Sequence, residues 1–351
     1  MKRCLQQIGD IFFVRSVEVF NMEKILTIIV PCYNSAEYLE RCVDSLLGGG
    51  KRVEIILVDD GSTDATGAML DGYARDYQNI QVIHQENRGH GGAINHALAV
   101  ARGQYVKIVD SDDWLDPNAY QAVLDFLAGH EPVDLLVCNY LYDKPALQQQ
   151  KRVKFNLPVS ETFGWDQVKL RPGQYLMLHA IIYREVLAES GIKLPEKVSY
   201  DDNLFVFEPM KYVDTICYLP VDLYHYYTGR DDQSVNEQVM LRKINQQLLI
   251  NQKMIIFYAV QIGESDPCQK YLKYYLEIIT TISSVILLLA GDRQSLKLKR
   301  DLWNFLKVYD YATYKSFRKR PLGLGVNLPG RGGRRIVTRL YQVAKKIYAF
   351  N

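Results

Sequence analysis

From residue 25 onward, continuous apolar runs alternate with segments of helical periodicity. Residues 25–30 are apolar and rich in β-branched side chains, which is typical of a strand buried on both faces of a parallel sheet. Residues 35–47 place their apolar side chains on one helical face, and three glycines follow. Because this alternation repeats, we expect a mostly parallel α/β sheet with helices on both faces. The pattern predicts further strands at 53–58, 80–84, 105–109 and 133–139, and further helices at 62–77, 91–101 and from about 117.

The pattern changes at three places. Residues 1–21 do not continue into the first strand, and we treat them as an N-terminal extension. Residues 142–230 mix aromatic, basic and acidic side chains without a clear period, as a region facing a substrate can. From 239 to 311, helical periodicity dominates, and this predicts an α-helical C-terminal region.

Two acidic segments directly follow predicted strands. Asp59 and Asp60 follow the second strand, and Asp110 and Asp112 follow the fourth. Since the carboxyl ends of parallel strands meet at one edge of a sheet, we expect the two segments to lie together. Carboxylate oxygens suit Mg²⁺ or Mn²⁺, which can neutralise a departing diphosphate. An isolated acidic pair in a turn more often caps a helix, but a second cluster on the same edge favours a site.

Three segments resemble the family 2 glycosyltransferases, which are inverting enzymes of GT-A fold. They are Val-Pro-Cys-Tyr-Asn-Ser at 30–35, Val-Asp-Asp-Gly-Ser-Thr-Asp at 58–64 and Val-Asp-Ser-Asp-Asp-Trp at 109–114. The resemblance covers roughly residues 25–235. It implies a Rossmann-like sheet, a nucleotide-sugar donor (usually a UDP-sugar) and Mg²⁺ or Mn²⁺. In the site that holds the sugar donor, it suggests Pro31, Tyr33, Asn34, Asp59, Asp60, Gly89, Asn95, Asp110 and Arg230.

The resemblance also implies individual roles. Asp60 would bind the nucleotide base, Asp110 the ribose or a metal-bound water, and Asp112 the metal. His225 is a further candidate metal or phosphate contact, although a lone histidine is more often structural.

An inverting transfer needs a base that takes the proton of the acceptor hydroxyl. Residues 199–205 resemble the acidic pair that supplies this base in the family, which suggests Asp202, with Asp201 as the alternative. Asp201 could equally cap the following helix. For the acceptor side, we consider Trp165, His179, Gln233 and Ser234.

The predicted domain of 22–237 divides into a sugar-donor half at about 22–140 and an acceptor half at about 141–237, and 238–351 forms the helical region. We expect transfer to a hydroxyl of a glycan, lipid-linked glycan or cell-surface polymer. The alternatives are a nucleotidyltransferase and a non-catalytic sugar-binding protein. The segment Arg-Gly-His-Gly-Gly at 88–92 could suggest a dinucleotide fingerprint, but its third glycine is missing and it follows the wrong strand.

Charge is distributed unevenly along the 351 residues. Residues 315–351 contain ten Lys and Arg and no acid, which leaves 32 bases and 40 acids in the rest of the chain. From 334 to 348, apolar and basic residues occupy different helical faces, as in a helix that lies on an anionic membrane. The alternative is a docked terminal helix with solvated charges. Without a nucleic-acid motif, we expect no nucleic-acid partner.

The six cysteines form no C-x-x-C pair, which excludes the usual structural zinc motifs and suits a reducing compartment. The longest apolar run, 278–290, is short for a membrane span. We therefore expect a cytoplasmic enzyme, with the basic tail at 315–351 as a candidate contact to the inner face of the plasma membrane.

Overall fold

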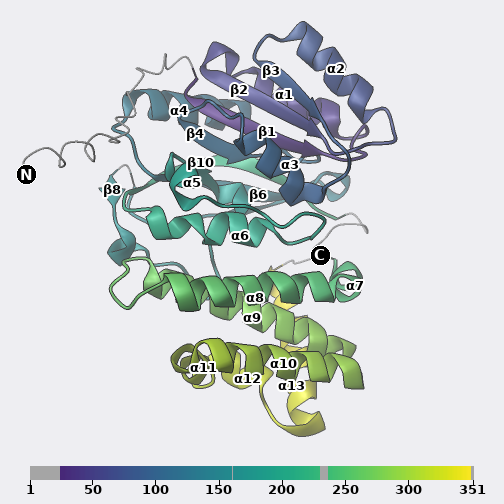
Figure 1. Cartoon of the computed structure of the whole chain (residues 1–351), viewed down its shortest axis with the longest axis vertical. Coiled ribbons are helices and arrows are strands. Elements are labelled where there is room, and N and C mark those ends of the chain that lie inside the picture. Colours follow the sequence, from purple (N-terminus) through teal and green to yellow (C-terminus); the bar gives the residue numbers. More distant parts are fainter. Residues whose placement is uncertain (1–23, 160, 230–235, 349–351) are drawn as a thin grey trace, which may run out of the picture.

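The computed structural model describes residues 24–159, 161–229 and 236–348; residues 1–21, 230, 233 and 234 therefore lie outside the described part. In these ranges a ten-stranded mixed sheet is flanked by helices, and a helical region stacks against one end of it (Figure 1). The strand order is β3-β2-β1-β4-β9-β6-β10-β5, with β7 beside β6 and β8 beside β10. The strands are β1 (Leu26–Cys32), β2 (Val53–Asp59), β3 (Ile80–His84), β4 (Tyr105–Ile108), β5 (Trp114–Leu115), β6 (Leu135–Lys144), β7 (Gln149–Val153), β8 (Thr162–Phe163), β9 (Ile181–Tyr183) and β10 (Ile216–Tyr227).

The predicted parallel core is confirmed. β1 pairs in parallel with β2 on one side and with β4 on the other, and β2 pairs in parallel with β3. Every residue of β1, β2 and β4 is buried, as their continuous apolar pattern predicts. The carboxyl ends of β2 and β4 therefore share one edge of the sheet, where the predicted acidic segments begin.

The region expected to be irregular contributes the rest of the sheet. β9 pairs antiparallel with both β4 and β6, and so joins the parallel core to the second half. β10 then pairs in parallel with β6, with register shifts near Asp222. This half of the sheet brings residues after 180 next to β4 and its acidic loop.

Helices cover both faces of the sheet. Arg52, shortly after α1, donates a hydrogen bond to Asp125 of α4, and Gln121 of α4 donates to the carbonyl oxygen of Gly48 at the end of α1. The helices α1 and α4 are therefore neighbours. α3 and α6 lie in front of the sheet in Figure 1. The α-helices of this part are α1 (Leu39–Leu47), α2 (Thr66–Asp76), α3 (Gly89–Leu98), α4 (Pro117–Gly129), α5 (Val186–Ser190) and α6 (Asp202–Phe207), and the 3-10 helices are η1 (Gly50–Arg52), η2 (Pro145–Leu147), η3 (Trp165–Gln167), η4 (Leu178–Ala180) and η5 (Pro209–Tyr212).

The C-terminal part is helical, as predicted, and α8 packs against α6 (Figure 1). Lys243 and Gln246 hydrogen-bond Ser199, and Tyr275 donates to Asn203, so this region supports the start of α6. Its helices are α7 (Glu237–Arg242), α8 (Ile244–Gln261), α9 (Gln269–Ala290), α10 (Arg293–Tyr309), α11 (Tyr311–Phe317), α12 (Pro321–Val326) and α13 (Gly330–Tyr348). Among the described residues, α9 alone has the length and apolar composition of a membrane span, and 72% of its most apolar window is buried inside the protein, as in a core helix.

Candidate active site

The three predicted acidic segments meet around the N-terminus of α3. The side chain of Asp60, after β2, accepts hydrogen bonds from the backbone N–H groups of Arg88 (2.6 Å) and Gly89 (2.8 Å). Gln85 Nε2 donates to the same carboxylate at 2.7 Å. Since three donors hold this buried side chain, the end of β2 is fixed against the start of α3.

The neighbouring Asp59 belongs to the turn itself. It accepts the Ser62 N–H at 2.9 Å, and its other oxygen lies 2.9 Å from His84 Nδ1. Burial alone would raise the pKa of Asp59, but the hydrogen bonds from Ser62 and His84 hold it below its usual value.

The acidic loop after β4 presents Asp110 at its surface and Asp113 in its interior. The backbone N–H of Asp110 donates to the Tyr224 hydroxyl oxygen at 3.1 Å, and the same hydroxyl donates to Asp113 at 2.6 Å. Asp113 also accepts the Tyr227 N–H at 2.7 Å, so it fastens the loop to β10. Burial, followed by the charges of Asp112 and Asp110, raises the pKa of Asp113 well above its usual value.

Arg41 supports the same loop from α1. Its Nη2 donates to the backbone oxygen of Asp112 at 2.9 Å, and its guanidinium lies 3.8 Å from the centre of the Trp114 ring. The centre of the Tyr227 ring lies 4.9 Å from the same guanidinium. This stack fixes the backbone on both sides of Asp113.

His90 joins the β4 loop to the acidic pair at the start of α6. Its Nδ1 lies 3.0 Å from Asp201 Oδ2, and its Nε2 lies 3.2 Å from Asp110 Oδ1. Burial alone would lower the pKa of His90, but Asp201 and Asp110 raise it well above its usual value. Burial alone would raise the pKa of Asp110, but the hydrogen bond to His90 and the charge of His90 lower it.

Asp202 is the partly exposed member of the acidic pair. Burial, followed by the charge of the neighbouring Asp201, raises its pKa to about 7. A carboxyl group with such a pKa can accept a proton near neutral pH. Asp201 stands at the N-cap position of α6, but its side chain makes no capping hydrogen bond and bonds His90 instead.

The structure forms a candidate cation group that differs from the predicted one. Asp110, Asp113 and His179 each offer a ligand atom, and these atoms lie within 4.8 Å of one another. Among described atoms, the buried Nδ1 of His179 has no hydrogen-bond partner. Two carboxylates and an imidazole suit a divalent cation such as Mn²⁺. Asp110 is common to this group and to the predicted set of Asp110, Asp112 and His225.

Two predicted residues lie at the edge of the sheet after β1. Tyr33 is 52% exposed, and Asn34 has a left-handed backbone with φ of 49°. The side chain of Asn34 accepts the Thr63 N–H at 2.8 Å, so it joins the two loops that follow β1 and β2. Pro31 is buried within β1, directly before them.

Other predicted contacts have structural explanations. His225 stacks on Trp114 and lies 2.9 Å from Asp143. Asn95 exchanges two hydrogen bonds with the backbone of Leu194, both of 2.9 Å. Trp165 is buried and donates to the carbonyl oxygen of Val213.

His179, predicted at the acceptor side, is buried instead between the acidic loop and Tyr226, whose ring it stacks on. The predicted contacts Arg230, Gln233 and Ser234 lie outside the described residues.

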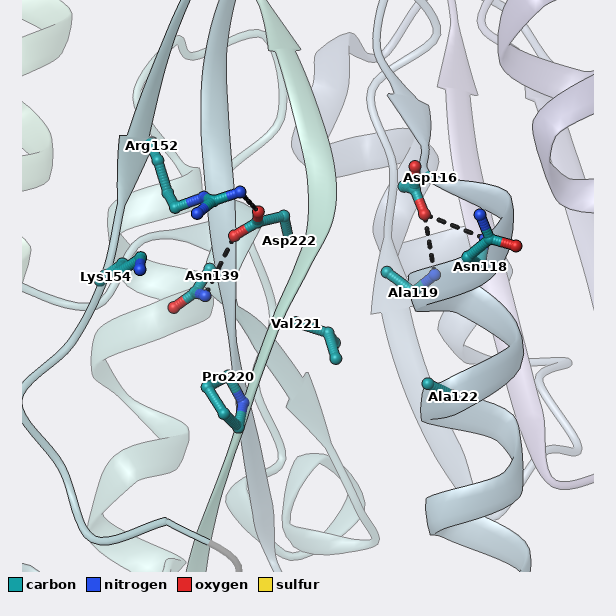
Figure 2. Close-up of a pocket in the computed structure, with 10 residues that line it drawn as sticks. All are labelled: Asp116, Asn118, Ala119, Ala122, Asn139, Arg152, Lys154, Pro220, Val221 and Asp222. Atoms are coloured by element: carbon teal, nitrogen blue, oxygen red, sulfur yellow. Dashed lines mark hydrogen bonds and ion pairs between the residues drawn. The ribbon is translucent and has the colours of Figure 1, made fainter.

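Figure 2 shows a separate pocket of about 470 Å³ between α4 and the strands β6, β7 and β10. Asp222 pairs there with Arg152 and accepts from Asn139, and Asp116 caps α4 on the opposite wall. None of the acids predicted for catalysis or metal binding lines this pocket.

Comparisons with known proteins agree with the family resemblance of the three sequence segments. Residues 27–190 match the model of Glycosyl transferase family 2. EpsH of Bacillus subtilis is 30% identical over 213 residues, which cover 57% of this chain and 60% of EpsH. The MG025 homolog of Mycoplasma pneumoniae, an uncharacterized glycosyltransferase, is 31% identical over 218 residues, which cover 60% of this chain and 70% of that protein.

The fold also resembles a solved structure, that of S. aureus TarS 1–349 in complex with UDP-GlcNAc. The TM-score is 0.68 at 21% sequence identity, and the match covers 91% of this chain and 92% of that one. The likeness therefore includes the C-terminal helices as well as the sheet.

Proposed function

The chain belongs to glycosyltransferase family 2 and has the GT-A fold, and we propose that it transfers a sugar from a UDP-sugar, with inversion, to a hydroxyl group. The proposed acceptor is a glycan, a lipid-linked glycan or a cell-surface polymer. The name of the solved TarS complex, which includes UDP-GlcNAc, supports a UDP-sugar as the donor.

One observation carries the proposal: His90 contacts both Asp110 of the β4 loop and Asp201 beside Asp202. The acids proposed for the nucleotide sugar and the acid proposed for the acceptor therefore occupy one site, although more than 90 residues separate them in the chain. An inverting transfer needs this proximity because the hydroxyl attacks while the diphosphate departs from the opposite side of the sugar.

In the proposed mechanism, Asp60 binds the nucleotide base, and the exposed ring of Tyr33 lies beside that base. Asp110 and Asp112 would hold a divalent cation, which would supply positive charge to the diphosphate. Asp202 takes the proton from the acceptor hydroxyl while the hydroxyl oxygen bonds the anomeric carbon and the bond from that carbon to the diphosphate breaks, which releases UDP. Its pKa of about 7 leaves much of it deprotonated at neutral pH.

The test is UDP release from a panel of UDP-sugars with Mn²⁺ or Mg²⁺. We expect Asp112→Ala and Asp202→Asn to lower turnover by at least about 100-fold, because they remove a metal ligand and the base. Turnover like that of the unaltered protein in both variants would contradict the assignment. In thermal-shift measurements with Mn²⁺, UDP should stabilise the protein more than GDP or TDP; the reverse order would contradict the choice of UDP.

We also propose that α13 contacts an anionic membrane surface. Its exposed face carries Ile336, Leu340 and Val343, each more than half exposed, next to the exposed Arg335 and Arg339. This combination of apolar and basic residues is typical of a helix that lies at a membrane interface. The enzyme would then act at the cytoplasmic face of the plasma membrane.

A further inference from the structure

The N-terminal part of α3 binds the segment that leads to Asp202. The Lys197 N–H donates to the Arg88 carbonyl oxygen at 2.7 Å, and Arg88 pairs with Glu196 at 3.6 Å. About two turns further along, Asn95 forms its two hydrogen bonds with Leu194. Residues 194–201 are therefore fixed to α3 at several points before α6 begins.

Glycines allow this close approach. A Cβ at Gly91 would lie 2.7 Å from the Pro195 oxygen and 2.9 Å from Asp201 Oδ2. Gly89 has φ of +76°, and a Cβ there would lie 2.9 Å from the Lys197 nitrogen. The two glycines on either side of His90 thus let the backbone of 194–201 come close enough for Asp201 to reach the imidazole.

The same segment has an unfavourable backbone. Lys197 and Tyr200 have φ of 56° and 70°, a left-handed conformation that costs about 1 kcal/mol or more for residues other than glycine. Tyr200 stands two residues before Asp202. Asn203 supports this conformation from within, through hydrogen bonds to the Tyr200 carbonyl oxygen and to Asp202. The contact of Asp201 with His90 supports it from α3, directly beside Asp202.

His90 is well suited to this task because both of its ring nitrogens have carboxylate partners, which fix the orientation of the ring. Asp201 is 2% exposed in its side chain, and the described contacts give it no other side-chain partner than His90. Loss of the imidazole would leave the buried Asp201 carboxylate without the hydrogen bond that offsets the cost of its burial. The segment 194–201 could expose the carboxylate to water only by moving. Because Asp202 is the next residue, such a movement would displace it.

We propose that His90 is a positioning residue for the proposed base: through Nδ1 it holds Asp201, and so fixes Asp202 toward the sugar donor. This role rests on the proposed function. It is independent of which sugar or acceptor the enzyme uses, and it gives the glycines of the Gly-His-Gly-Gly segment a purpose other than dinucleotide binding.

Two substitutions separate the two contacts of the imidazole. In His90→Asn, the amide nitrogen occupies roughly the place of Nδ1 and can still reach Asp201; in His90→Gln, it occupies roughly the place of Nε2 and can reach only Asp110. We expect His90→Asn to keep kcat within about fivefold and His90→Gln to lower it about 10- to 100-fold, because small displacements of a reacting group have effects of this size. KM for the UDP-sugar should change less than threefold in both. The matched control is His130→Asn at the C-terminal end of α4, where the imidazole contacts only the Glu131 backbone oxygen and the Phe126 ring, and it should leave kcat unchanged.

The opposite order of kcat, or wild-type kcat in both variants, would overturn the proposal, as would a rise in donor KM without a fall in kcat. If a His90 variant melts before assay temperature, the single variant Asp201→Asn decides: it should lower kcat with donor KM unchanged, and wild-type kcat would overturn the role of the contact. Failure of the proposed function has a different signature, since the unaltered protein would then release no UDP, or Asp202→Asn would remain active.

Discussion

At the scale of single residues, the environment of Asp202 determines how it can act. Its pKa of about 7 results from burial and from the charge of Asp201 beside it. An ordinary aspartate, with a pKa near 3.9, is a weaker base. The site therefore produces a stronger base by placing two carboxylates together, and His90 limits the repulsion between them.

This pKa predicts the pH dependence of the reaction. At saturating substrate and metal, kcat should rise with pH and level off above about 7, because the base must be deprotonated to accept a proton. The measurement is UDP release between pH 5.5 and 9, with metal saturation checked at each pH. A rate that is constant down to about pH 5 would contradict Asp202 as the base.

The same pKa predicts a cost in stability. Because the folded pKa of Asp202, about 7, lies above the unfolded value of about 3.9, the folded state loses stability as pH rises through this interval, and the full loss is present above pH 7. Asp202→Asn should therefore raise the melting temperature at pH 8, less so at pH 5, and hardly at pH 4. Asp301→Asn, at an exposed acid of α10, is the control and should show no such trend. An equal effect at all pH values would contradict the assignment.

Some site residues can be read from the sequence and others cannot. Asp60, Asp110 and Asp202 follow from recognisable segments, and the sharing of one sheet edge by the first two follows from β-α alternation. The sequence does not single out His90, because its importance depends on Asp201, which is 111 residues away. The visible signal was the glycine on each side of it, which indicated a close backbone approach without showing to what.

At the scale of elements, the sequence predicts the buried parallel strands best. β1, β2 and β4 lie within one or two residues of their predicted positions, because strands buried on both faces have continuous apolar runs. α1 begins four residues later than predicted, at Leu39, because the hydroxyl of Ser35 bonds Ser111 rather than capping the helix. The sequence pattern does not predict the 12-residue strand β10, since its tyrosines and histidine mask the usual apolar signal.

The contact between α3 and residues 194–201 predicts the effect of one added methyl group. Gly91→Ala should destabilise the protein by about 1–3 kcal/mol, because the new Cβ would collide with the Pro195 oxygen. Gly72→Ala, in the middle of α2, has open space at this position and should instead stabilise by about 0.5–1 kcal/mol. Urea unfolding of both variants tests the pair. Equal effects would show that 194–201 does not pack on α3 as described.

At the scale of the whole molecule, the structure shows where the acidic and the basic parts of the chain lie. The acidic body contains the sheet and its site, and the basic residues after 315 belong to the last helices: α11 and α12 lie at the end of the molecule away from the sheet, and α13 runs from there back toward α7 (Figure 1). Val337 is buried, so α13 is docked through one side, while Ile336 and Leu340 on another side are exposed. Both sequence interpretations of the tail therefore hold in part: the helix is docked, and it still presents an amphipathic face.

This exposed face predicts binding to anionic vesicles. The full-length protein should co-sediment with vesicles of phosphatidylglycerol and phosphatidylcholine but not with phosphatidylcholine alone, since each basic residue near an anionic surface contributes about 1 kcal/mol. The double variant Ile336→Ser with Leu340→Ser should bind at least about tenfold more weakly, because it removes apolar area that would enter the interface. Val308→Ser, at an 80% exposed apolar position on α10, is the matched control and should bind like the unaltered protein. Equal binding to neutral vesicles, or equal losses in both variants, would show that α13 is not the membrane contact.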